Sequence, residues 1–228
     1  MVEALIRQFC KYPLDFISHL FLLLPVTIGA YRQKYLTNTL LSVAIYFAVQ
    51  FLQETVLLNY TLNKCSSIKL QQLLLILDTV ILSEIFFLAF KDRKSNKYIT
   101  LFALTISLLV STIDYLIIPL TSISSSLFKL TIILFSLMYF NKILSENRIK
   151  NVLKHSMFWI SSGFLLLGMG TFFSSLFIDY LLGDSKEQDN AFDLFWAIDQ
   201  VVICLQCILI AIGLWVSKFD KNNYILPV

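Results

Sequence analysis

The stretch LFWAIDQVVICLQCILIAIGLW, Leu194–Trp215, determines the class of fold that we expect for this chain. It runs for 22 residues and contains one charged side chain, Asp199. A helix needs about 20 predominantly apolar residues to cross the hydrocarbon layer of a bilayer. The stretch therefore predicts a membrane-spanning helix.

Six further apolar blocks of comparable length precede it. Together they predict spans near residues 13–31, 38–59, 70–90, 98–119, 127–142, 157–182 and 194–216. The fifth is short unless Ser124–Ser126 begin it. The connections between the blocks are short and polar, and none is long enough to hold a folded domain outside the membrane. We therefore expect an all-α, polytopic protein whose residues 1–228 form one seven-transmembrane-helix bundle.

The composition agrees with this expectation. Of the 228 residues, 57% are hydrophobic and 14% are charged, whereas ordinary soluble domains carry about 25% charged residues. So few charges cannot cover the surface of a soluble globule of this size. The composition excludes a soluble enzyme, a nucleic-acid-binding protein and a disordered linker.

Lysine and arginine predict the orientation, because they gather in cytoplasmic loops. One side of the predicted membrane carries 12 of them: Arg32, Lys34, Lys91, Arg93, Lys94, Lys97, Lys142, Arg148, Lys150, Lys154, Lys218 and Lys221. The other side carries six: Arg7, Lys11, Lys64, Lys69, Lys129 and Lys186. We expect the N-terminus outside and the C-terminus in the cytoplasm, in a bacterial inner membrane. No small-x-small cleavage site follows Phe16–Ala30, so the first span is expected to remain uncleaved.

Polar side chains within the spans are the informative residues, because burying them in lipid costs free energy unless they face the bundle interior. At 100° per residue, several of them share one helical face. Asp15 and His19 are four residues apart, as are Gln50 and Glu54. Longer stripes follow Thr100, Ser107, Ser111 and Asp114, and also Asp199, Gln206 and Gly213.

Most of these residues fall in the outer half of the predicted bundle. They predict a ligand-binding or ion-binding cavity lined by Asp15, His19, Gln50, Glu54, Asp78, Ser111, Asp114, Lys129, Asp199 and Gln206. One lysine cannot neutralise five carboxylates, so some are expected to hold protons or bind cations. The alternative is a structural hydrogen-bond network that orders the helices and binds nothing.

Other residue patterns carry weaker expectations. Cys10 and Cys65 are both predicted outside, where a disulfide is possible in an oxidising compartment. Cys204 and Cys207 are expected to be buried thiols, since no second cysteine pair or nearby histidine completes a zinc site. Gly170 and Ser174 form a small-xxx-small step in the 157–182 span, which favours packing inside the bundle, with a homodimer contact as the alternative.

Several membrane chemistries lack their residues. The last span has no lysine for a retinal Schiff base, and His19 and His155 are too few for a zinc hydrolase. No phosphate-binding glycine loop or H-E-x-x-H motif is present. We expect no cofactor and no metal, although an intramembrane hydrolase based on Asp78, Asp114 and Asp199 stays open.

Three stretches carry a resemblance. They are LLLPVTIGAYRQKYL (Leu22–Leu36) with its P-x-x-x-G-x-x-R pattern, HSMFWISSGFLLLGMG (His155–Gly170), and the Leu194–Trp215 stretch with its Ile-Gly-Leu exit. Together they resemble an uncharacterised family of small seven-helix bacterial integral membrane proteins. The resemblance implies a signalling protein that accompanies a cytoplasmic partner such as a sensor kinase, and it assigns no activity to any residue.

The function we expect is that of a non-enzymatic, receptor-like sensor that binds a ligand in the outer cavity and passes a helix shift to a cytoplasmic partner. The basic segments Lys91–Lys97 and Arg148–Lys154 would contact that partner or anionic lipid. The alternatives are a small transporter of cations, protons or polar solutes, an aspartate-based membrane enzyme, and a subunit whose polar seam meets another protein. No inverted repeat supports the transporter.

Overall fold

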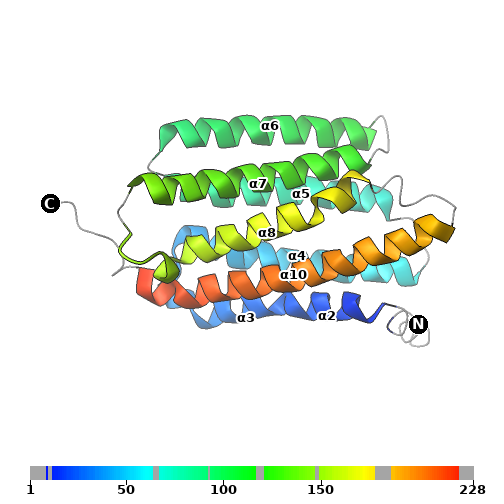
Figure 1. The fold of residues 1–228 in the computed structure, drawn as a ribbon, viewed down its shortest axis with the longest axis horizontal. Coiled ribbons are helices and arrows are strands. Elements are labelled where there is room, and N and C mark those ends of the chain that lie inside the picture. Colours follow the sequence, from blue (N-terminus) through cyan, green and yellow to red (C-terminus); the bar gives the residue numbers. More distant parts are fainter. Residues whose placement is uncertain are drawn as a thin grey trace.

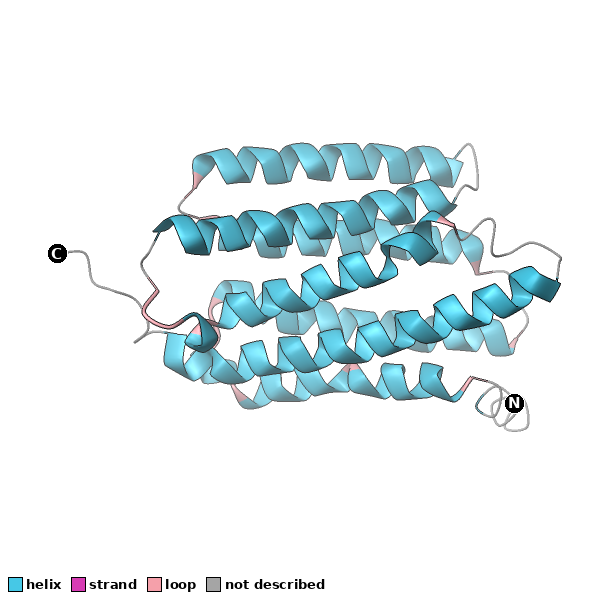
Figure 2. Ribbon diagram, in the orientation of Figure 1, coloured by secondary structure: helices cyan, strands magenta, loops and turns pink. Residues whose placement is uncertain are grey.

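The computed structural model describes residues 9, 12–63, 67–91, 93–116, 121–146, 149–177 and 186–220. These residues form helices, with turns and loops at several helix ends (Figure 2). The helices are α2 (Pro13–Phe21), α3 (Leu23–Tyr31), α4 (Asn38–Leu62), α5 (Ile68–Ala89), α6 (Lys94–Leu116), α7 (Thr121–Glu146), α8 (Ser156–Leu176) and α10 (Lys186–Asp220). Short 3-10 turns occupy Gln33–Tyr35 and Val152–Lys154.

Seven spans are long and apolar enough to cross a membrane among the described residues. They coincide with the seven predicted blocks, and α2 and α3 together make the first. The helix ends differ from the prediction by several residues. The largest differences are at α7, which has 26 residues, and at α10, which has 35.

The polar flanks explain both extensions. Ser124 and Ser126, which lower the local hydropathy at the start of α7, are helical and buried in the bundle. The polar residues before Leu194 are helical too, so α10 starts earlier than its apolar block. At 1.5 Å per residue, α10 is about 52 Å long, which exceeds the hydrocarbon thickness of about 30 Å.

The first span is interrupted at Leu22, between α2 and α3. The cause lies three residues further on. Pro25 has no backbone N–H to donate to the carbonyl of Phe21, and its ring crowds that carbonyl. The backbone of Leu22 stays near helical values (φ −60°, ψ −27°), so the span kinks without reversing.

The helices form a closed ring in the order α2–α3, α4, α5, α7, α8 and α10, with α10 returning to α2 and α3. α6 packs outside this ring against α5 and α7. In Figure 1, α6 is accordingly the outermost helix at the top, and α2 and α3 lie at the opposite edge. α2 and α10 begin at the same end of the bundle.

Two glycines of α8 allow the close packing of this ring. A Cβ on Gly168 would lie 2.8 Å from Cγ1 of Ile133 in α7, and a Cβ on Gly170 would lie 2.8 Å from Cγ2 of Val202 in α10. The Gly170–Ser174 step therefore faces α10.

One half of the ring is filled by aromatic side chains. Phe86 packs on Phe135 and Phe164, with ring centroids 5.4 and 5.9 Å apart, and Phe90 packs on Tyr139 at 6.1 Å. We call these five residues the aromatic cluster. It lies toward the end where α5 ends and α8 begins, and it leaves the polar residues to the other half.

Candidate functional site

Two adjoining cavities lie inside the ring. The deep cavity has a volume of about 330 Å³ and reaches Tyr46, Asp78 and Gln206, near the middle of α4, α5 and α10. The end cavity, about 660 Å³, lies where α2 and α5 begin and α4 ends, as its lining residues Tyr12, Thr61 and Gln71 show. Both cavities are lined by Asp15, His19, Glu54, Lys129 and Gln200. These shared side chains form the boundary between them.

Eight of the ten residues predicted for the site line these cavities. Asp15, His19, Glu54 and Lys129 line both, Gln50, Asp78 and Gln206 line the deep cavity, and Asp199 lines the end cavity. They come from α2, α4, α5, α7 and α10. The polar faces of these five helices therefore meet at the two adjoining cavities.

Ser111 and Asp114 line neither cavity. Both are buried, with 2% and 7% of their surface exposed, on the face of α6 that also carries Thr100 and Ser107. The helical periodicity correctly predicted that these residues share one face of α6. However, α6 lies outside the ring, so that face packs on α5 and α7 and is separated from the cavities by those helices.

Four serine and glutamine residues of the deep cavity, Ser18, Ser125, Ser175 and Gln200, were missing from the sequence prediction. Ser18 on α2 donates a hydrogen bond to Oε1 of Gln200 on α10 and so ties the two helices together beside the cavity. Ser175 on α8 also lines it. Ser18 and Gln200 adjoin predicted residues in sequence, which was a usable signal, but serine is too common in membrane helices to single out Ser175.

Hydrogen bonds orient the carboxylates of α5 and α10. Nε2 of Gln53 donates to Oδ1 of Asp78 over 3.1 Å. Oγ of Ser174 lies 2.8 and 2.7 Å from the two carboxylate oxygens of Asp199 and donates one hydrogen bond to that group. Each bond holds the side chain of a carboxylate in place, while its remaining oxygen lone pairs are left for another partner.

His19 is held between α2 and α4. Its Nε2 lies 3.3 Å from Oγ1 of Thr55, and its ring packs on Phe51 with centroids 4.5 Å apart. The Thr55 hydroxyl also donates to the Phe51 carbonyl. A hydroxyl whose proton is directed to that carbonyl accepts from His19, which places the imidazole proton on Nε2 in this arrangement.

The charges are spread along the cavities. Within the described residues, no carboxylate lies at ion-pairing distance from Lys129, although Asp78 and Asp199 lie close enough to act on it electrostatically. No three histidine, cysteine, aspartate or glutamate side chains of the described chain are grouped to hold a metal ion. Asp78, Asp114 and Asp199, the candidates for an aspartate hydrolase, do not line a common cavity.

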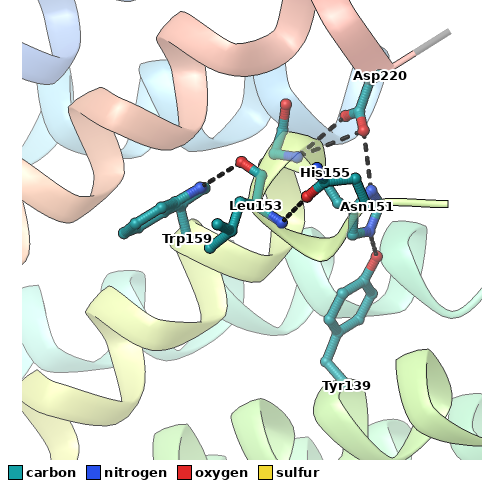
Figure 3. Close-up of polar contacts among 7 residues, drawn as sticks. Tyr139, Asn151, Leu153, His155, Trp159 and Asp220 are labelled. Carbon is teal, nitrogen blue, oxygen red and sulfur yellow. Dashed lines mark hydrogen bonds and ion pairs between the residues drawn. The ribbon is translucent and has the colours of Figure 1, made fainter. Parts of the chain in front are cut away.

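A second polar cluster closes the opposite end of the bundle. Nδ1 of His155, at the start of α8, lies 2.8 Å from Oδ1 of Asp220, the last residue of α10, and its Nε2 lies 2.8 Å from the hydroxyl of Tyr139 on α7 (Figure 3). The Asp220 carboxylate also accepts from the backbone N–H of Ser156. Sequence reasoning did not find this cluster, because Asp220 and His155 are 65 residues apart.

The four cysteines fall into two pairs, for which the sequence predicts different states. Cys204 and Cys207 lie on α10 as free thiols, and Cys207 is buried. Cys10 and Cys65, the possible disulfide, lie outside the described residues.

Comparison with known proteins adds no further information about the site. No family model matches the chain, no curated protein matches it, and no solved structure matches it. The resemblance to small seven-helix bacterial membrane proteins therefore depends on its three stretches alone, and the function has to be argued from the cavities.

Proposed function

We propose that this protein is a multi-pass membrane sensor that binds a small polar solute in the deep and end cavities. The cavities would open to the outside of a bacterial cytoplasmic membrane, with the C-terminus in the cytoplasm. The excess of lysine and arginine at the opposite end of the bundle supports this orientation. Binding would shift the helices of the ring relative to one another and be read by a cytoplasmic partner.

The observation that carries the proposal is the convergence of eight polar side chains from five helices on a space of ligand size. Pockets for small molecules have volumes of about 300–1,000 Å³. A network that served only to order the helices would pair all of its members directly, its one lysine included. Here Lys129 has no carboxylate at ion-pairing distance among the described residues.

The aromatic packing favours sensing over conduction. Tyr46 and Phe47 end the deep cavity, and both pack on Phe164, with ring centroids 5.8 and 6.5 Å apart. Phe47 and Phe164 are fully buried. A solute that reached the middle of the bundle would meet this close-packed layer, so it would be held rather than passed on.

One observation supports transport as a second candidate. Leu22, at the break between α2 and α3, lines the deep cavity. Helices interrupted at membrane depth mark the substrate sites of many transporters, where one repeat rocks against another. The broken helix here has no counterpart among the other described spans.

The end of the bundle that carries His155 and Asp220 would transmit the signal to the cytoplasmic partner. His155 and Asp220 join the start of α8 to the end of α10 there, and α8 and α10 both contribute residues to the cavities. A shift between α8 and α10 at the cavities would therefore alter the contact between His155 and Asp220. The basic segments Lys91–Lys97 and Arg148–Lys154 would dock a sensor kinase or another signalling protein.

Thiol accessibility tests the proposal. Ser175→Cys is made in a variant whose four native cysteines are alanine, and right-side-out and inside-out vesicles are treated with membrane-impermeant charged methanethiosulfonates. A sensor cavity reacts from the outside only. Reaction from both sides would favour the transporter, and no reaction from either side would leave only the structural network. Ser161→Cys, fully buried on the same helix, is the matched unreactive control.

A further inference from the structure

We infer that the solute is an organic cation, which places an ammonium group between Asp15 and Glu54. This inference depends on the proposed binding function and names the chemistry of its ligand. It follows from the charges that line the cavities, from the aromatic side chains among them, and from one buried amide.

The charge balance of the lining is negative. The two cavities together are lined by four carboxylates, Asp15, Glu54, Asp78 and Asp199, against one lysine, Lys129. With His19 neutral and every carboxylate ionised, the formal charge is −3. Enclosed clefts lined by one sign of charge concentrate solutes of the opposite sign, so the lining favours a cation over an anion or a zwitterion.

The lysine is not placed to neutralise the whole lining. Lys129 comes from α7, which lies between α5 and α8 in the ring. Asp15 and Glu54 come from the neighbouring helices α2 and α4, on the other side of the ring, and both line both cavities. The wall formed by α2 and α4 is therefore the place where a positive charge is least opposed.

Aromatic side chains accompany the carboxylates in the end cavity. Tyr12, Phe16, Phe192 and Trp196 line it together with Asp15, Glu54 and Asp199. Tyr12 and Trp196 pack edge to face with centroids 4.9 Å apart. Aromatic faces attract organic ammonium groups through their quadrupoles, and such groups lose less hydration than a bare metal ion. Carboxylates interleaved with aromatic rings are suited to an amine.

The spacing of the carboxylates argues against a metal ion as the solute. Divalent cations need several oxygen ligands gathered at about 2.0–2.6 Å. In the described chain no three acidic, histidine or cysteine side chains are grouped closely enough for that. Carboxylates spread over a cavity of about 330 Å³ and an adjoining one of about 660 Å³ suit an extended molecule with separated cationic groups.

Gln206 offers a polar group to a solute at the deep end of the cavity. Its side chain lines the deep cavity and is 3% exposed, and no hydrogen bond joins it to any residue that the structure describes. Its amide borders the cavity and is not one of the sealed, unpartnered polar atoms of the described chain. A solute with a polar group at the deep end would satisfy it, and an ammonium group can donate to the amide oxygen.

The experiment compares two charged methanethiosulfonates, one with a trimethylammonium group and one with a sulfonate group. Each reacts with the Ser175→Cys thiol in the cysteine-free background. We expect the ratio of the rate with the trimethylammonium reagent to the rate with the sulfonate reagent to exceed the same ratio for a free small thiol at least tenfold. Glu54→Gln and Asp15→Asn should each lower this ratio at least threefold. Asp193→Asn, an exposed carboxylate of α10 outside both cavities, should leave it unchanged. Ser125→Cys, which also lines the deep cavity, replaces the reporter if Ser175→Cys does not fold.

A ratio no higher than that of the free thiol would overturn the inference and leave the binding function standing. A thiol that reacts with neither reagent would overturn both, because the cavity would then be closed to solutes. The same reporter also tests the ligand directly, by its modification with neutral methyl methanethiosulfonate. Putrescine should slow this reaction at least fivefold, whereas its neutral isostere 1,4-butanediol should not. Equal protection by the diol, or by magnesium chloride in place of putrescine, contradicts the assignment.

Discussion

His155 and Asp220 lock the start of one helix to the end of another: Nδ1 of His155 lies 2.8 Å from Oδ1 of Asp220. The same carboxylate accepts from the backbone N–H of Ser156, in the first turn of α8. It therefore serves both as the partner of a buried imidazole, 2% exposed, and as the cap of a helix whose own sequence supplies no side-chain cap. A carboxylate at a helix N-terminus also interacts favourably with the helix dipole.

Asp220→Ala should destabilise the protein by about 2–4 kcal/mol. The substitution leaves Nδ1 of His155 without its acceptor, which costs about 1–3 kcal/mol for a buried polar group, and removes a cap that contributes about 1 kcal/mol. Thermal unfolding of the detergent-purified protein measures the change. Asp193→Ala removes an exposed carboxylate of the same helix and should leave the melting temperature within error. Equal melting temperatures for the two variants would show that the contact contributes nothing.

Gly168→Ala should lower the free energy of unfolding by about 1–3 kcal/mol, the usual cost of overpacking a dense interior. Its new methyl would lie 2.8 Å from Cγ1 of Ile133 and 3.2 Å from the carbonyl oxygen of Lys129, so α8 would have to move away from α7. Met169→Ala, at the exposed neighbouring position, is the control. A Gly168→Ala protein as stable as the control would mean that α7 and α8 separate at no cost.

Arg32→Ala should cost about 0.5–1 kcal/mol and change the tryptophan fluorescence. The guanidinium carbon of Arg32 lies 3.9 Å from the centroid of the Trp215 ring, and a cation over an indole face contributes about this much at a partly exposed site. Lys34→Ala, an exposed cation two residues along, controls for the loss of charge. Identical emission spectra and melting temperatures for the two variants would contradict the stacking.

The number of spans could be predicted from the sequence because hydropathy and length depend on local composition alone. Seven apolar blocks predicted the seven helical segments of the described chain that are long and apolar enough to cross a membrane. The helix ends were less predictable, since Ser124 and Ser126 have the hydropathy of a loop and the burial of a core. The break at Leu22 was also absent from the prediction, although Pro25 marks it.

The candidate site was predictable in part, for a geometric reason. Helical phase shows which residues share a face, and it correctly grouped Asp15 with His19 and Gln50 with Glu54. It does not show which helix that face meets. Asp220 and His155 show the complementary limit. They are in contact, but two residues so far apart in sequence carry no local signal of that contact.

Asp114 and Asp199 test the difference between sharing a helical face and lining the cavity. The sequence predicted both as site residues, whereas the structure places only Asp199 at a cavity. Asp199 lines the end cavity, whereas Asp114 is buried where α6 packs on α5 and α7. Asp199→Asn should therefore lower the preference of the Ser175→Cys thiol for the cationic reagent about threefold, because one of the four lining carboxylates loses its charge. Asp114→Asn should leave that preference unchanged, since the charge it removes lies outside the ring. Rates of thiol modification in the two variants, measured side by side, check this. Equal loss in both would mean that the α6 seam and the cavities form one continuous polar space. Loss in the Asp114 variant alone would transfer the site to α6.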